Sequence, residues 1–414
     1  MVTNNIIDLH DAILHHIFAL CSSVMDLPVH RSICSRICHV LSQPTYLLER
    51  RRQGTAQEML VFAGGVHRPF GRSAGFGKKR SSASRSMTPI RKIYAFVPSL
   101  KSWKVFGRVR ISESCSFDEF DDYHYCLEGR PLPYLERVEE YRVVHIWPEK
   151  LVFLGGVYID EGGLPSDEVW SYSFSSNTWE QLPNMIRKRS SKCFQAIVVG
   201  SNILVFGCED EFYDSNNYSE KFCWHEQRWT SIGDVPSEVD DFLITSCSPH
   251  ELYLIGNSAS VAFLYNMKCD SWIQLDVTNV LRRQSAGIIT NTNGEIILIG
   301  GFYDGSDVVR LNDNERIAHN DHLNLVDSIR DPGRGKNVTR CAKLPIKKSD
   351  VVSCVFRRCV TVLGGRTGFS SKRVTGENKI WQLNEKMSKW TPISDIKSPP
   401  LPGIVGAHAF SLWL

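Results

Sequence analysis

The chain has no long, uninterrupted hydrophobic run. The apolar stretch nearest its N-terminus, residues 6–25, is interrupted by Asp8, Asp11 and three histidines. A helix that crosses a bilayer needs about 20 consecutive, mostly apolar residues. We therefore expect neither a transmembrane helix nor a signal peptide, and no membrane partner.

An excess of charge of one sign is also missing. The 414 residues include 48 Lys+Arg and 45 Asp+Glu, which gives a formal net charge of +3. Domains that bind nucleic acids usually carry a clustered basic surface. The composition therefore gives no reason to expect a nucleic-acid partner.

Paired cysteine motifs are absent. The chain has 13 cysteines, an odd number, and no Cys-x-x-Cys pair. Several cysteines lie in or beside apolar segments, where a free cysteine behaves as a small buried hydrophobe. Because disulfides are rare in reducing compartments, we expect free thiols and a cytoplasmic location, with the nucleus as a second compartment.

Motifs for catalysis and metal binding are absent too. The chain contains no His-Glu-x-x-His, no Gly-x-Ser-x-Gly and no phosphate-binding glycine loop, and its histidines lack metal-ligand spacing. Each of these chemistries requires its residues at a defined spacing. We expect no enzymatic activity, no cofactor and no metal site.

What the chain does contain is a short apolar segment that ends at glycine and recurs six times. The copies are LVFAGG at 60–65, LVFLGG at 151–156, ILVFGC at 203–208, LYLIGN at 252–257, IILIGG at 296–301 and VTVLGG at 360–365. A period of roughly 45–50 residues is typical of propeller blades. Such a repeat predicts a platform for binding.

A second signal follows five of the six copies. A large apolar residue is followed seven positions later by tryptophan, in the pairs Phe96/Trp103, Tyr172/Trp179, Phe222/Trp229, Tyr265/Trp272 and Leu383/Trp390. Because one repeat cannot bury its apolar face alone, we interpret these pairs as packing between neighbouring blades. The fifth repeat lacks its tryptophan.

Together these patterns predict a mainly β fold, a six-bladed β-propeller over residues 55–414. In the second repeat, the four strands are expected at 142–147, 151–156, 168–174 and 178–182. No strand precedes the first repeat, and no glycine-terminated strand follows residues 406–414. We expect this last segment to complete blade one, since ring closure removes open sheet edges.

Residues 1–54 predict a short α-helical segment. Apolar residues recur every three or four positions over 5–25 and again to about residue 42, before the basic run at 49–53. These helices either belong to a larger helical domain or dock on the propeller. Insertions are expected in blade one, at 67–89 and 112–137, and in blade five, at 312–340 between its third and fourth strands.

The double glycine, the aromatic residue and the tryptophan seven positions later resemble the kelch repeat. The resemblance covers residues 55–414, with departures at 207–208 and 256–257, where GC and GN replace the double glycine. The sequence YLLERRRQ at 46–53 resembles the end of a BACK domain. The chain is thus similar to the BTB-BACK-Kelch family, without a BTB domain before the helices.

This resemblance implies a role in protein binding. Such proteins typically join a cullin-RING ubiquitin ligase through BTB and BACK, while the propeller holds the substrate. The chain would then be a substrate-recognition adaptor that binds a degron peptide, and it would bind a cullin scaffold only in a form that contains BTB. An actin- or cytoskeleton-binding kelch protein is the alternative. A copper-oxidase propeller would need a Tyr/His copper site and is disfavoured by the cysteine usage.

The partner is expected on the face where the loops after the second strands meet the loops between blades. Arginine and tyrosine are enriched at binding hot spots, and arginine pairs with carboxylates through two hydrogen bonds. The loop at 237–242 is acidic, so a partner with both charges fits best. The predicted contacts are Arg68, Tyr158, Arg187, Arg189, Ser190, Arg282, Arg283, Tyr303, Lys347 and Arg366.

Overall fold

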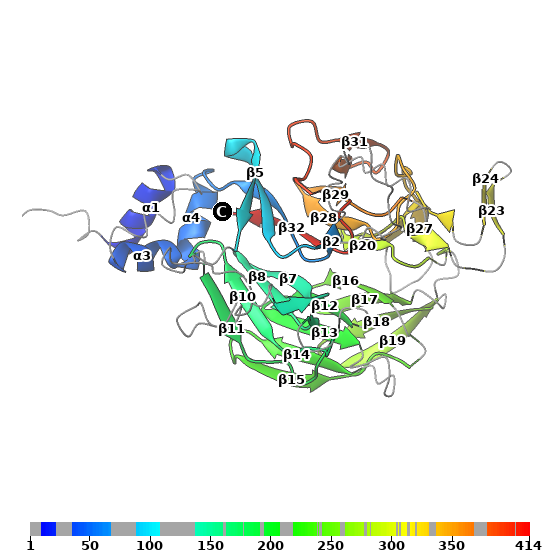
Figure 1. Ribbon diagram of the computed structural model, residues 1–414, viewed down its shortest axis with the longest axis horizontal. Coiled ribbons are helices and arrows are strands. Elements are labelled where there is room, and N and C mark those ends of the chain that lie inside the picture. The colour runs from blue at the N-terminus through cyan, green and yellow to red at the C-terminus, as the bar shows by residue number, and fades with distance from the viewer. Residues whose placement is uncertain are drawn as a thin grey trace, which may run out of the picture.

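The computed structural model shows a six-bladed β-propeller with helices packed at one edge (Figure 1). It describes residues 10–21, 35–67, 88–107, 137–159, 163–176, 178–190, 194–207, 218–237, 239, 242–256, 261–276, 280–281, 283–303, 305, 308–312, 315–318, 321–330, 337–367, 379–401 and 403–414. None of the helices described is long and apolar enough to cross a bilayer.

Each blade is a four-stranded antiparallel sheet. From the inner to the outer strand, the blades are β32 (His408–Trp413), β1 (Glu58–Ala63), β4 (Ile93–Val97) and β5 (Ser102–Phe106); β7 (Arg142–Ile146), β8 (Lys150–Leu154), β10 (Val169–Ser173) and β11 (Thr178–Leu182); β12 (Phe194–Val199), β13 (Asn202–Gly207), β14 (Ser219–Cys223) and β15 (Arg228–Ile232); β16 (Phe242–Ser248), β17 (Glu251–Gly256), β18 (Val261–Asn266) and β19 (Ser271–Asp276); β20 (Gly287–Thr290), β21 (Ile296–Ile299), β26 (Val326–Arg330) and β27 (Asn337–Arg340); and β28 (Val352–Phe356), β29 (Cys359–Leu363), β30 (Trp381–Leu383) and β31 (Trp390–Pro392).

The inner strands form a closed ring. Contacts run from β32 through β7, β12, β16, β20 and β28 and back to β32. In blade one, the C-terminal strand pairs with β1, with Ala409 opposite Phe62. The prediction that residues 406–414 complete this blade is confirmed, and the two ends of the ring are joined by backbone hydrogen bonds.

Glycine at the end of the second strands is required by close backbone approach. Gly65 has φ 71°, and a Cβ there would lie 2.4 Å from the carbonyl oxygen of Val405. Gly156 has φ 93°, and its Cβ would lie 2.4 Å from the carbonyl oxygen of Glu139. A side chain at either position would displace the neighbouring loop.

The repeated aromatic residues and tryptophans face one another across the third and fourth strands. Tyr172 lies opposite Trp179, with ring centroids 5.1 Å apart. The Trp179 indole N–H donates to the carbonyl of Gly107, just after the outer strand of blade one, at 3.2 Å. The same bond to the preceding blade joins Trp103 to Lys397, Trp229 to Pro183, Trp272 to Gly233 and Trp390 to Ala342. These tryptophans therefore connect neighbouring blades, as predicted.

Blade five differs from the prediction in where its extra residues lie. Strands β26 and β27 fall inside the range 312–340, so an insertion between them over that range is wrong. The extra residues lie earlier, between β21 and β26. They include β22 (Phe302–Tyr303), β25 (Asp321–His322) and a hairpin of β23 (Val309–Asn312) and β24 (Glu315–Ile317), which projects from the ring (Figure 1). Without an aromatic pair in this blade, the third and fourth strands were hard to locate from sequence.

The N-terminal helices pack on the propeller. They are α1 (Asp11–Cys21), α3 (Ser35–Ser42) and α4 (Pro44–Arg52). Leu14 and Tyr46 are buried in one cluster with Met59 and Leu412 of blade one and Tyr172 of blade two. The stretch that includes the basic run, which we expected to lead out of a helix, is itself the helix α4, with proline in its first turn.

Both insertions predicted in blade one lie almost wholly outside the described residues. Short strands lie beside them in the sequence. The strands β2 (Val66–His67) and β3 (Thr88–Pro89) pair at the two ends of the first insertion. The strand β6 (Val138–Glu139) follows the second insertion and pairs with β9 (Val157–Tyr158).

Candidate partner-binding face

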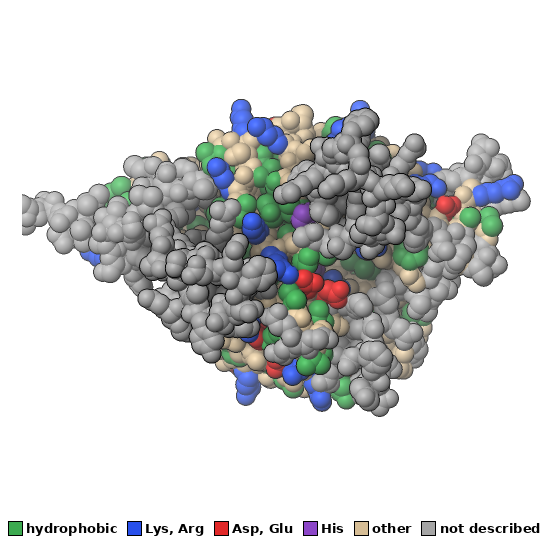
Figure 2. Space-filling model, viewed as in Figure 1, with side chains coloured by type: hydrophobic (Ala, Val, Ile, Leu, Met, Phe, Trp, Pro, Cys, Tyr) green, Lys and Arg blue, Asp and Glu red, His purple; other side chains and the backbone are tan. Residues whose placement is uncertain are grey.

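Two sets of loops meet on one face of the ring, which we call the loop face. Residues that follow the second strands form bridges with residues that precede the inner strands, in the pairs Val66/Val405, Gln284/Phe302 and Ser349/Arg366. Around the centre of the view in Figure 2, basic, acidic and apolar side chains adjoin one another. Among the described residues of the loop face, Lys347 lies near Asp321 and Arg366 near Asp350, so both signs of charge occur there. The acids of the loop at 237–242 lie outside the described residues.

Three cations of the inter-blade loops are buried. Arg189, Arg283 and Lys348 have exposures of 0%, 4% and 5%. Each donates to the carbonyl of the glycine that ends the second strand of its blade, at Gly207, Gly300 and Gly364 respectively. Because neither guanidinium is accessible, the prediction of direct partner contact is wrong for Arg189 and Arg283.

The buried arginines are paired with carboxylates of the third strands. The Arg189 guanidinium lies 2.9 Å from Glu220, and that of Arg283 contacts Asp327, which also binds Arg340. Burial lowers the pKa of Arg283, while Asp327 acts in the opposite sense. A buried ion pair of this kind fixes local geometry, since loss of one partner leaves an uncompensated charge.

Tyr158 is held by a carboxylate at the start of the third strand of blade two. Its hydroxyl donates to Glu168 at 2.7 Å, and the Trp170 indole N–H and the Arg137 guanidinium approach the same carboxylate at 2.7 Å and 3.2 Å. Burial, with help from Glu168, raises the pKa of Tyr158 to about 12. The hydroxyl therefore remains a hydrogen-bond donor at neutral pH, and the half-buried ring is fixed against its loop.

Three exposed apolar side chains lie on the loop that contains Tyr158 and on the neighbouring loop to which it is bonded. Ile159, Leu164 and Ile186 are 41%, 54% and 51% exposed. Their two loops are joined by backbone hydrogen bonds, among them one of 2.8 Å from the Arg189 N–H to the Ser166 carbonyl. This group contains three of the eleven large apolar side chains that are exposed among the described residues.

Two exposed cations complete the group. Arg187 and Lys188 follow Ile186 directly, and the Arg187 guanidinium lies 4.5 Å from the centre of the Tyr218 ring. An apolar group bordered by arginine and tyrosine is the composition of a binding hot spot. We define the blade two–three edge as Tyr158, Ile159, Leu164, Ile186, Arg187 and Lys188.

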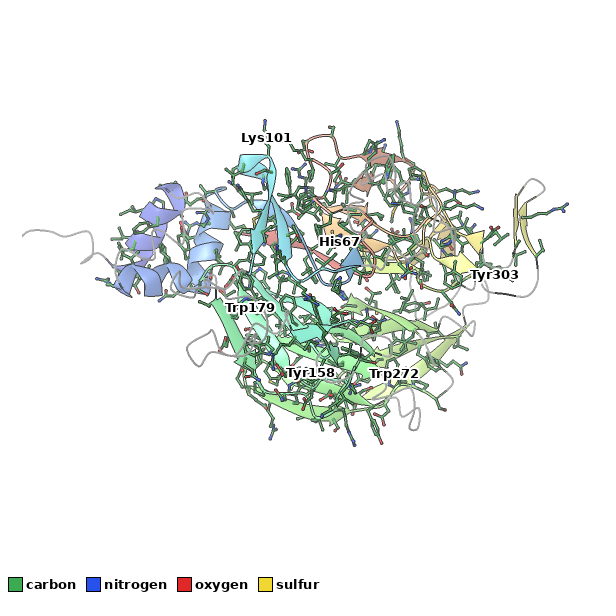
Figure 3. The ribbon with its side chains drawn as sticks, viewed as in Figure 1. His67, Lys101, Tyr158, Trp179, Trp272 and Tyr303 are labelled. Atoms are coloured by element: carbon green, nitrogen blue, oxygen red, sulfur yellow. The ribbon has the colours of Figure 1, made fainter. Side chains whose placement is uncertain are left out.

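The other predicted contacts do not join this group. Tyr303 is 6% exposed and packs in a small cluster with Ile317, so direct contact is wrong for its side chain as well. Figure 3 shows Tyr303 near the outside of the ring, far from Tyr158. Lys347 and Arg366 are exposed and face acids, at 3.9 Å from Asp321 and 3.2 Å from Asp350. Ser190 is half-buried. The two remaining predicted contacts, Arg68 and Arg282, lie outside the described residues.

Sequence reasoning missed the residues that build the edge. Ile159, Leu164 and Ile186 are single apolar residues in polar loops, so no periodic pattern marks them. Glu168 and Glu220 did carry a signal, since Glu168 directly precedes a strand whose side chains are all buried and Glu220 lies in a strand between buried neighbours. A carboxylate there requires a nearby cation.

No group of three or more His, Cys, Asp or Glu side chains that could hold a metal ion occurs in the described part of the chain. The chemistry available at the blade two–three edge is thus burial of apolar groups, hydrogen bonding and charge pairing.

Comparison with known proteins adds little to this description. No protein-family profile matches the chain, and no curated protein matches it. Among solved structures, it resembles one titled "Structure of YjhT" at 14% sequence identity and a TM-score of 0.49, over 73% of this chain and 91% of that chain. The six-bladed propeller is therefore assigned from the strand pairing of the chain itself.

Proposed function

We propose that the chain is a protein-interaction module that binds a partner protein at the blade two–three edge. The observation that carries this proposal is the group Ile159, Leu164 and Ile186, which is exposed on two loops that backbone hydrogen bonds join and that the buried Arg189–Glu220 pair holds on one side. An exposed apolar group on a rigid support needs little reordering on binding, which favours affinity.

The partner segment fits best if it combines an apolar side chain with charges of both signs. Arg187 and Lys188 offer two exposed cations, while the sequence of the neighbouring loop contains Asp160 and Glu161. When the charges of a partner surface complement those of this edge, the gain is mainly in specificity and less in affinity.

We further propose that binding serves substrate recognition in a cullin-RING ubiquitin ligase. The kelch-like repeat and the BACK-like end of the helical segment support this role. The packing of the helices on blades one and two also supports it, because a helical segment fixed to the propeller would hold a bound substrate in a defined orientation.

The test is affinity capture from cells with the full chain, in wild-type form and with Leu164→Ser and Ile186→Ser together. We expect the double variant to lose its main partner, and an Arg366→Gln variant on the other side of the loop face to retain it. Retention by the double variant would contradict the proposed edge.

The ligase role is tested separately, by asking whether the captured partner becomes ubiquitinated when the chain is supplied in a form that binds a cullin. Co-sedimentation with actin filaments, together with no effect on ubiquitination, would favour the cytoskeletal alternative. The outcome of this ligase test does not affect the test of the blade two–three edge, which depends only on partner capture.

A further inference from the structure

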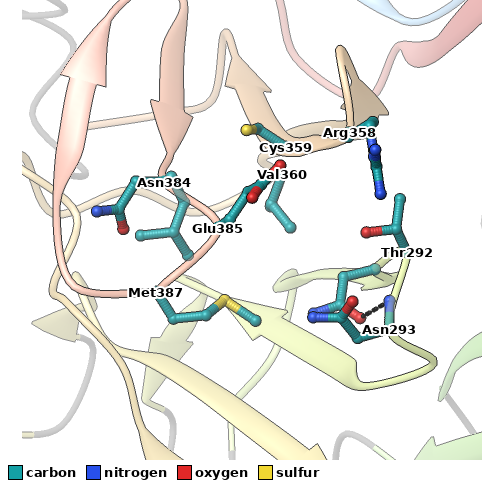
Figure 4. Close-up of a pocket in the computed structure, with 10 residues that line it drawn as sticks. Thr292, Asn293, Arg358, Cys359, Val360, Asn384, Glu385 and Met387 are labelled. Atoms are coloured by element: carbon teal, nitrogen blue, oxygen red, sulfur yellow. Dashed lines mark hydrogen bonds between the residues drawn. The ribbon is translucent and has the colours of Figure 1, made fainter.

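The ends of the strands opposite the loop face form a small pocket between blades five and six (Figure 4). Its cavity volume is about 80 Å³. It is lined by residues 291–293 of blade five, and by residues 358–360, residues 383–385 and Met387 of blade six. All these residues belong to hairpin turns or to the strand ends beside them, so the pocket is separate from the blade two–three edge.

One of these turns has an unfavourable sequence for its conformation. Phe356 pairs with Cys359, so the turn contains two residues, Arg357 and Arg358, with φ of 51° and 62°. Two-residue turns with positive φ at both positions strongly prefer Asn-Gly or Asp-Gly. Backbone strain of this kind is concentrated at functional sites.

The two arginines have different surroundings. Arg357 is held in place, because its guanidinium lies 2.7 Å from Asp395 and its backbone N–H donates to Glu58 at 2.9 Å. Arg358 makes no ion pair with any described side chain, and it lines the pocket. The strained turn therefore places at the pocket a cation that has no ion-pair partner among the described side chains.

Neutral polar groups border the pocket near this cation. The side-chain oxygen of Asn291 accepts the backbone N–H groups of Asn293 and Glu295, both at 2.9 Å, which fixes the turn of blade five. In Figure 4, Thr292 faces Arg358 across one side of the pocket. A hydroxyl and a guanidinium can both donate to one carboxylate.

The rest of the lining contains one acid and a thiol beside apolar side chains. Glu385 is the acid of the lining, and Lys386 and Lys389 are exposed on its own turn. Burial raises the pKa of the Cys359 thiol, Glu385 acts in the same sense and Arg358 in the opposite one. The thiol therefore stays neutral at pH 7. The charged lining residues are Arg358 and Glu385, and Lys386 and Lys389 add positive charge on the turn of Glu385.

We propose that this pocket binds the carboxylate side chain of an aspartate or glutamate from a partner protein. The carboxylate pairs with Arg358 and accepts from Thr292, while its methylene groups contact Met387. A pocket of this volume holds one side chain, so the ligand is a single acidic residue on a protein surface. The propeller would thereby hold a second protein on the face opposite the blade two–three edge.

The test uses the full ¹⁵N-labelled chain, titrated with N-acetyl-glutamate N-methylamide and with its glutamine counterpart. We expect the amide signals of Thr292, Asn293 and Arg358 to shift with a dissociation constant of about 1–10 mM, as for a ligand of this size. The glutamine compound should bind about tenfold more weakly, because it lacks the charge-assisted bond.

Substitutions test whether Arg358 is required for binding of the carboxylate. Arg358→Gln should abolish the shifts at the blade five turn, whereas Lys389→Gln, a matched change of a nearby exposed cation, should leave them. A second variant combines Arg357→Asn with Arg358→Gly, which relieves the strain in the turn. It should raise the melting temperature and still lose binding. This result would show that binding is lost because the site is removed and not because the chain misfolds.

Three results would overturn the proposal. These are equal binding of the glutamine compound, unchanged binding in Arg358→Gln, or the absence of any shift with glutamate. A titration with inorganic phosphate tests which anion the pocket prefers. Tighter binding of phosphate than of the capped glutamate would be a fourth result against a carboxylate site.

Discussion

Arg189 donates hydrogen bonds to the carbonyls of Gly207 and Tyr218 and to Glu220, and its own side chain is wholly buried. Its contribution is therefore to hold the loop that presents Ile186 and Arg187. Arg187 and Arg189, two positions apart in one loop, thus have different roles, because Arg189 is buried and Arg187 is exposed.

Arg189→Ala should lower the free energy of unfolding by about 3–5 kcal/mol, because Glu220 would remain buried without its partner. Urea denaturation measures the change. Arg187→Ala, at an exposed position, should change stability by less than about 0.5 kcal/mol. Similar losses in the two variants would contradict the assigned roles.

Half-buried histidines make stability dependent on pH. Burial lowers the pKa of His145 to about 4, and burial with the nearby Arg142 lowers the pKa of His408 to about 3. In the unfolded chain, imidazole has a pKa of about 6.5. As the pH falls below that value, the unfolded state takes up protons that the folded state excludes, so stability decreases.

We expect full stability from these groups above about pH 6.5 and a progressive loss toward pH 4. Urea midpoints measured across this range check the prediction. His145→Phe should make the decrease shallower, since it removes one of the groups that exclude a proton in the folded state. An unchanged slope in that variant would show that other groups dominate.

At the scale of elements, five of the six blades are joined to the preceding blade through a tryptophan on the outer strand. Trp229 packs on Phe222 at 5.1 Å and donates to Pro183 of the preceding blade at 2.8 Å. Blade five replaces this pair with Ile329 opposite Val338. The junction between blades four and five therefore depends on aliphatic packing.

Trp229→Phe keeps an aromatic ring but removes the indole donor, so it should lower the free energy of unfolding by about 1 kcal/mol. Trp229→Ala also removes the packing and should lower it by about 3–5 kcal/mol. Trp147→Phe, at a 53% exposed position, is the matched control. Thermal unfolding followed by calorimetry measures all three, and equal effects at Trp147 and Trp229 would contradict the junction.

At the scale of the whole molecule, blade one is built from both ends of the propeller sequence. Six backbone pairs, from Glu58/Trp413 to Ala63/His408, join β1 to β32. The N-terminal helices share a buried cluster with the same blade. Ring closure and helix docking thus depend on one another.

Removal of residues 406–414 should open the ring, expose the edge of β1 and cause aggregation. Size-exclusion chromatography and the melting temperature report this change. Addition of a synthetic peptide of residues 406–414 should restore the melting temperature in part. An unchanged melting temperature in the truncated chain would show that the closing strand is dispensable.

The sequence alone determined the repeat, the number of blades, the closing strand and the packing role of the tryptophans. These four features follow from sequence patterns that recur at the same place in successive repeats, since successive blades must satisfy the same steric requirements. In blade five, where Ile329 and Val338 replace the aromatic pair, the pattern no longer located the strands.

Only the tertiary structure decided which loop residues are available to a partner. Arg187 and Arg189 are both arginines of one loop, and Tyr158 and Tyr303 are both tyrosines after a double glycine. Their exposure depends on carboxylates and apolar groups that arrive from distant strands, such as Glu220 and Leu325. A side chain turns inward or outward according to contacts that no local pattern contains.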